Sequence, residues 1–97
     1  MNNDVKATVE QCPKLQLRLN KGERHRIMHS GIRSGSLWIT PRLNCYCVCP
    51  TGEAEPPLYD FLCSHFGTET GTDQNRKYWN IENYGDVAKV IRRFGEL

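Results

Sequence analysis

The sequence has no long hydrophobic run and no hydrophobic segment at its beginning. No stretch of about 18 apolar residues occurs, so we expect no membrane-spanning helix and no membrane partner. The first twenty residues contain no apolar core of a signal peptide. These absences predict a cytoplasmic protein. In that compartment the five cysteines are expected to be reduced thiols or metal ligands, not a disulfide framework.

Motifs that mark catalysis or cofactor binding are also missing. The chain contains no Gly-rich phosphate loop, no nucleophile elbow and no paired-carboxylate motif. A cysteine nucleophile would need His25, His29 or His65 as its base, and no local motif brings such a pair together. The sequence therefore predicts a protein that is not an enzyme and that carries no cofactor.

A strong charge of either sign is lacking as well, but the charges are unevenly distributed. The net charge is only +2. Residues 1–42 contain eight Lys or Arg against three acids, a net +5, and residues 43–97 contain five against eight, a net −3. A basic first half permits a nucleic-acid-binding face, although the whole chain is less basic than a typical nucleic-acid-binding domain.

The length and composition predict a single globular domain over residues 1–97. The chain is 38% hydrophobic and 25% charged, which is ordinary for a globular protein and unlike a disordered one. Residues 1–11 show no apolar period and predict a flexible arm. Residues 68–75 contain no apolar side chain and predict an exposed loop.

Short strands are predicted in the first half of the chain. Three leucines alternate with polar residues over 14–19, which is the period of a half-buried strand. Further strands are predicted at 25–29, 36–40 and 45–49, with turn residues between them. Together these segments predict a small antiparallel meander of about four strands.

Two helices and a fifth strand follow the meander. Residues 57–66 place apolar side chains on one helical face, and 76–81 reads as a strand. Asn83 can cap a final helix that ends near Gly95. Its apolar stripe, at the spacing of one helical face, is Val87, Val90, Ile91 and Phe94. We therefore predict an α+β domain in the order β-β-β-β-α-β-α, with both helices packed on one sheet face.

Three cysteines at two-residue spacing occupy the predicted strand at 45–49. In a strand, their thiols face the same side. A zinc site would draw on Cys45, Cys47, Cys49, Cys63 and His65. Residues i and i+2 of a strand lie ~6.6 Å apart, whereas two sulfurs on one zinc lie ~3.8 Å apart. We therefore expect no bound metal and interpret the cysteines as small core residues against which helix 57–66 packs.

The leading functional prediction is nucleic-acid binding through a basic N-terminal hairpin. A basic two-stranded ribbon can follow a phosphate backbone, and an aromatic side chain on its solvent side can stack a base. Trp38 lies on the opposite side of its strand from Leu37 and Ile39. The predicted binding residues are Lys14, Arg18, Lys21, Arg24, Arg26, Arg33, Trp38 and Arg42.

A protein partner is the alternative. A small domain without a catalytic motif can serve as an interaction module or an inhibitor, of the adaptor, mobile-element or phage accessory type. The predicted contact surface is then the outer face of the second helix together with the 68–75 loop. In that case the basic residues are merely solvated. The sequence indicates neither DNA over RNA nor an oligomeric state.

Overall fold

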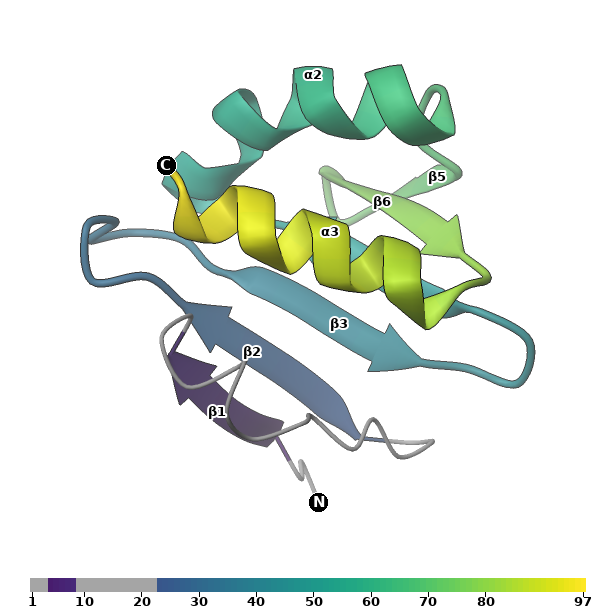
Figure 1. The fold of residues 1–97 in the computed structure, drawn as a ribbon, viewed down its shortest axis with the longest axis horizontal. Helices are drawn as coiled ribbons and strands as arrows, with labels where there is room; N and C mark the ends of the chain where they lie inside the picture. Colours follow the sequence, from purple (N-terminus) through teal and green to yellow (C-terminus); the bar gives the residue numbers. More distant parts are fainter. Residues whose placement is uncertain (1–3, 9–22) are drawn as a thin grey trace.

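The computed structural model describes residues 4–8 and 23–97, and it shows an α+β fold (Figure 1). The strands are β1 (Asp4–Thr8), β2 (Arg24–Met28), β3 (Leu37–Pro41), β4 (Tyr46–Pro50), β5 (Gly71–Asp73) and β6 (Arg76–Ile81). The helices are the short 3-10 helix η1 (Gly52–Ala54), α2 (Glu55–Phe66) and α3 (Tyr84–Gly95). The strand order is β1-β2-β3-β4-β6-β5, with β1 and β2 parallel and all other neighbours antiparallel. The predicted architecture, with α2 and α3 on one face of a mainly antiparallel sheet, is confirmed.

Two segments differ from the prediction. Part of the expected arm forms β1, which pairs in parallel with β2. Parallel neighbours cannot be joined by a tight hairpin, so no local turn signal announces this pairing. Part of the expected 68–75 loop forms β5, because a two-residue turn at Gln74 and Asn75, with φ of 52° and 65°, folds it back onto β6. The predicted strand at 14–19 lies outside the described residues.

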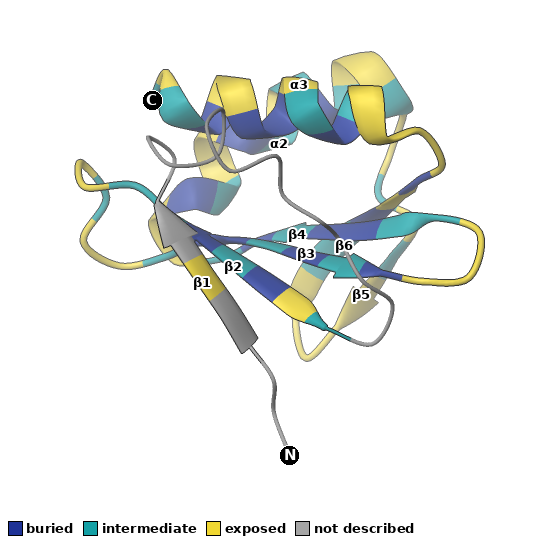
Figure 2. Cartoon of the chain, turned by 60° about the horizontal axis from the view of Figure 1, so that its bottom comes forward, coloured by how far each residue is buried: buried dark blue, intermediate teal, exposed yellow. Residues whose placement is uncertain are grey.

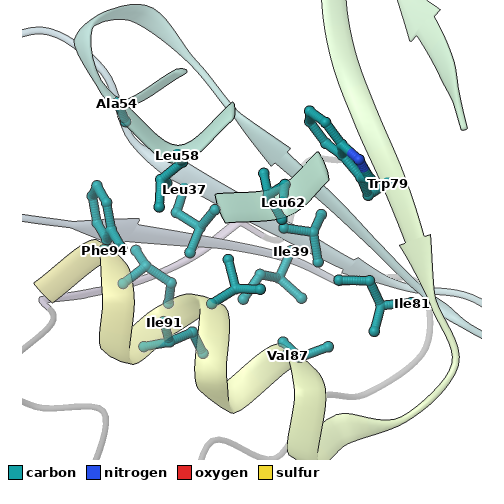
Figure 3. Packing of buried hydrophobic residues seen from close by; sticks show 13 residues of the cluster. Leu37, Ile39, Ala54, Leu58, Leu62, Trp79, Ile81, Val87, Ile91 and Phe94 are labelled. Atoms are coloured by element: carbon teal, nitrogen blue, oxygen red, sulfur yellow. The ribbon is translucent and has the colours of Figure 1, made fainter. Parts of the chain in front are cut away.

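The core lies between the two helices and the sheet (Figure 3). Leu37 and Ile39 point into it from β3, and Trp79 and Ile81 point into it from β6. The predicted stripe of α3 is buried along its whole length. The Trp79 indole N–H donates to the Gly67 carbonyl at 2.9 Å, which satisfies the one polar atom of this large side chain. The second half of the chain therefore supplies β6 and both of the helices that pack on the sheet.

A close crossing of two backbone segments fixes where α2 begins. The Glu53 N–H donates to the Ser34 carbonyl at 2.7 Å. Gly35 has a φ of 129°, and a Cβ there would lie 2.7 Å from the Glu53 nitrogen and closer still to the Thr51 carbonyl oxygen. Only glycine allows this approach. The connection before β3 is thereby held against η1, and α2 starts directly above the sheet.

Candidate nucleic-acid interface

The sheet has a second face that neither α2 nor α3 covers, which we name the outer face (Figure 2). Its side chains alternate with those of the core, so Trp38 and Thr40 lie there because Leu37 and Ile39 are buried. Residues paired in register share a face, which extends the assignment to the neighbouring strands. On the described strands, the outer face carries Lys6, Arg24, Arg26, Met28, Trp38, Thr40, Cys47, Cys49, Asp73, Arg76, Tyr78 and Asn80.

Two arginines of β2 stack on the tryptophan of β3. The guanidinium carbons of Arg24 and Arg26 lie 5.0 Å and 5.6 Å from the centre of the Trp38 ring. Arg26 also donates from Nε to the Ser36 hydroxyl at 2.8 Å. A cation over an aromatic face at such distances gains roughly 0.5–1 kcal/mol at an exposed site. We name these three residues the Arg-Trp stack; it holds two guanidiniums side by side at the surface.

The acid beside the Arg-Trp stack is directed to the other side of β2. The Glu23 carboxylate lies 3.8 Å from the Nε2 atom of His25. His25 is 1% exposed and faces the core side of the strand. Burial lowers the pKa of His25 below its usual 6.5, and the Glu23 carboxylate offsets only part of that effect. The Glu23 carboxylate therefore lies toward the core side of β2 and not on the outer face.

The other predicted binding residues are distributed differently. Lys14, Arg18 and Lys21 lie outside the described residues. Arg33 is exposed before β3 and lies beyond its end. Arg42 follows β3, and its side chain donates a hydrogen bond to the Cys47 thiol on the outer face, which partly offsets the effect of burial on the pKa of Cys47. Of the eight predicted positions, the structure brings together Arg24, Arg26 and Trp38, and Arg42 reaches the same face.

Two basic residues of the outer face were missed by the sequence reasoning. Lys6 is exposed and pairs with Arg26, because β1 adds to the edge of the sheet. Arg76 is exposed at the start of β6, on the same side as Tyr78. The alternation of 76–81 could have placed Arg76 opposite Trp79 and Ile81. No sequence signal could have placed Lys6, since its position depends on a parallel pairing.

The cysteine prediction is half right. Cys47 and Cys49 share a face, as the two-residue spacing predicts, but that face is the outer one. Val48, fully buried, points toward the helices in their place. The period fixes which residues share a side but not which side the helices cover, and the larger apolar Val48 gains more from the core than a thiol does.

This placement separates the suggested zinc ligands. Cys63 is on α2, so the sheet lies between it and the thiols of β4. Burial raises the pKa of Cys47, and burial together with the Cys47 charge raises that of Cys49 to about 11. Protonated thiols are poor ligands and nucleophiles. Within the described ranges, no three His, Cys, Asp or Glu side chains gather in a way that could hold a metal ion.

The other two histidines have structural contacts. The Gly31 N–H donates to Nδ1 of His29 at 2.8 Å, so Nε2 carries the proton and donates to the Gly95 carbonyl at 3.2 Å. His29 thereby joins the end of β2 to the end of α3. His65 contacts the Phe61 carbonyl one turn earlier in α2, at 3.0 Å.

We compared the chain with protein families, curated proteins and solved structures. No protein family model, curated protein or solved structure matches the chain. Over the described part of the chain, no helix combines the length and apolar character needed to cross a membrane.

Proposed function

We propose that this chain is a non-enzymatic domain that binds nucleic acid through the outer face of its sheet. The observation that carries the proposal is the Arg-Trp stack, in which one ring holds two guanidiniums at the surface. Arginine binds phosphate through a planar fork of donors, and a guanidinium already fixed by stacking loses less entropy on binding. Lys6 pairs with Arg26 and adds a third cation to the same area.

The charge pattern around the stack supports a polyanionic ligand. On the paired strands the outer face has four cations, Lys6, Arg24, Arg26 and Arg76, against two acids, since Asp4 pairs with Arg24 and Asp73 pairs with Arg76. Glu23, the acid adjacent in sequence, approaches His25 on the other side of the strand. Side chains that converge on one surface are what phosphate contacts require, whereas an evenly mixed surface would serve solubility alone.

Fluorescence anisotropy across a salt series tests this proposal. The probes are labelled single- and double-stranded DNA and RNA of mixed sequence. Each phosphate contact contributes about 0.7 to 0.9 to the slope of log affinity against log salt. We expect the double variant Arg24→Ala, Arg26→Ala to lose about tenfold to hundredfold in affinity. Its salt slope should fall by roughly 1.4 to 1.8.

A matched control removes the same charge elsewhere. Arg92 and Arg93 are exposed on α3, on the opposite side of the sheet, so Arg92→Ala, Arg93→Ala also lowers the charge by two. This control should bind as the wild type does. Equal losses in both double variants, or a wild-type affinity that hardly changes with salt, would refute specific phosphate contacts at the outer face.

A protein partner is the second candidate, and one surface feature favours it. Leu43, at the tip between β3 and β4, is 75% exposed. It borders a hollow of about 260 Å³, and beside that hollow the Tyr46 and Tyr84 rings pack edge to face with centroids 5.8 Å apart. The hollow is lined by Pro41, Arg42, Leu43, Asn44, Cys45, Tyr46 and Glu82. This surface differs from the one that the sequence suggested.

Pull-down from the native host separates the two candidates. A protein partner at the hollow should be retained by the wild type and by the Arg24→Ala, Arg26→Ala variant, and lost with Leu43→Ser. Nuclease treatment should leave that retention unchanged. Retention that disappears with nuclease, or with the arginine variant, points back to nucleic acid.

The proposed compartment is a reducing cytoplasm. Cys45, Cys47, Cys49 and Cys63 are free thiols. Free thiols persist where thioredoxin and glutathione keep cysteines reduced. Cell fractionation of a tagged chain checks this placement.

A further inference from the structure

A second aromatic side chain lies on the outer face, beyond the Arg-Trp stack. Trp38 of β3 pairs with Cys49 of β4. The pairing of β4 with β6 runs from Tyr46 opposite Ile81 to Val48 opposite Trp79. One more step of this register places Tyr78 beside Cys49. Trp38, Cys49 and Tyr78 therefore form one row across three strands, with the two aromatic residues about 10 Å apart at two strand spacings.

The Tyr78 ring is held against the edge of the sheet. It lies over Gly71 of β5, where a Cβ would come within 2.8 Å of the Tyr78 Cζ atom. Tyr78 is half-buried, so part of its side chain stays accessible to solvent beside the β5 backbone. Glycine opposite an aromatic residue lets the ring settle in this way.

The strand between the two aromatic residues carries small side chains on this face. Cys49 separates Trp38 from Tyr78 within the row. In the next row, Thr40 pairs with Cys47 and Cys47 pairs with Asn80. The exposed Asn80 side chain offers both a donor and an acceptor. Cations lie toward both ends of this surface, Arg24 and Arg26 at one and Arg76 at the other, where Arg76 pairs with Asp73 of β5.

We propose that the outer face binds a single strand of nucleic acid, with one base stacking on the Arg-Trp stack, on a guanidinium plane or the ring edge that it leaves exposed, and another stacking on Tyr78. This inference rests on the function proposed above and names the form of the ligand. The strand runs across the sheet from β2 to β6. Arg24 and Arg26 contact its phosphates at one end and Arg76 contacts them at the other. Asn80 hydrogen-bonds to the edge of a base that lies between the rings.

A double helix does not fit this surface. In a duplex the base faces are stacked on one another, so aromatic rings cannot reach them. Sequence is read in the grooves by elements that project into them, such as a helix or a two-stranded ribbon. The outer face is instead a sheet surface with two rings and scattered cations, which is the combination that single strands use.

Anisotropy with matched oligonucleotides tests the inference. The probes are a labelled unstructured single strand of twelve nucleotides and the duplex of the same sequence, each as DNA and as RNA. We expect the single strand to bind at least about tenfold more tightly than the duplex. Loss of one stacking ring should weaken single-strand binding about fivefold to a hundredfold.

The variants separate stacking from charge. Tyr78→Phe keeps the ring and should retain wild-type affinity. Tyr78→Leu keeps an apolar cover over Gly71 and should fold, but it should lose affinity with the salt slope unchanged, because stacking releases no counterions. Tyr84→Ala removes an aromatic side chain from α3, on the helix side, and should bind normally. Circular dichroism and thermal melting confirm that each variant is folded.

Tryptophan fluorescence gives an independent readout. Trp79 is buried in the core and contributes a constant signal, whereas Trp38 is half-exposed on the outer face. Single-stranded oligonucleotide should quench the wild type and should not quench Trp38→Phe. Duplex binding at equal or higher affinity, or wild-type affinity in folded Tyr78→Leu, overturns the inference while the proposed phosphate contacts stand. Salt-independent binding of every probe overturns the proposed function itself.

Discussion

The two faces of the sheet are made by the same strands and differ in almost every physical respect. The helix face is closed by α2 and α3 over fully buried apolar residues such as Val48 and Phe94. The outer face carries mostly half-buried and exposed side chains, among them Trp38 and its two arginines, although Cys47 is buried there. The helix face therefore supplies most of the buried apolar area that stabilises the fold, and the binding function proposed above uses the outer face. Three experiments test this division.

The largest expected effect comes from truncating the helix face. Phe94 is fully buried against the core, and Phe94→Ala should lower the free energy of unfolding by about 3–5 kcal/mol. Trp38→Ala removes a larger side chain, but one that is half-exposed, and should cost roughly 1–2 kcal/mol. Chemical denaturation measures both. A Trp38→Ala loss as large as that of Phe94→Ala would mean that the outer face also acts as core.

How much of this division could be predicted from the sequence depends on the periodicity of each element. The stripe of α3 repeats at helical spacing, and its four residues are all buried. Trp38 was correctly placed opposite Leu37 and Ile39 by strand alternation. Both predictions are correct because the periodicity of a helix or strand determines which of its residues share a face. The same local reasoning recovers much of the core.

The outer face could be predicted only in part, because it depends on contacts between elements. Strand alternation predicts that Cys47 and Cys49 lie on the same face, but it does not determine which face the helices cover. Lys6 joins the surface through a parallel pairing that no local pattern encodes. Arg24 and Arg26 lie on β2 and contact Trp38 on the neighbouring strand β3, and this contact depends on the register of β2 with β3. Sequence reasoning therefore named candidate residues without their arrangement.

The thiols of β4 provide the second experiment, because they lie on the face without helices and are still buried enough to be unreactive. Burial, with the neighbouring Cys47, raises the pKa of Cys49 to about 11, against 9.0 for an ordinary thiol. The thiolate fraction near pH 8 should be about a hundredfold smaller, and alkylation proportionally slower. Iodoacetamide labelling followed by mass spectrometry can compare native chain with chain unfolded in guanidinium. Equal labelling rates of Cys49 in the two states would contradict this assignment.

The smallest effect concerns His25, a buried polar residue on the helix side of the sheet. Both of its ring nitrogens are buried and make no hydrogen bond within the described residues. Burial favours the neutral ring and lowers its pKa, while the Glu23 carboxylate 3.8 Å away opposes that shift. Below pH 6.5 the unfolded chain therefore binds the proton more readily than the folded one. Stability should be fully present above pH 7 and should fall as the pH drops toward 5.

The slope of that loss identifies its source. A single histidine can contribute at most about 1.4 kcal/mol per pH unit. His25→Leu replaces two unpaired nitrogens by an apolar side chain, so it should flatten the pH dependence without loss of stability at pH 7. Glu23→Gln removes the charge that favours the protonated ring and should make the acid loss steeper. Urea denaturation between pH 5 and 8 measures all three chains. If the free energy of unfolding of His25→Leu depended on pH as that of the wild type does, other titrating groups would cause the loss of stability in acid. The protonated His25 ring would then be tolerated on the helix side, against the expectation from burial.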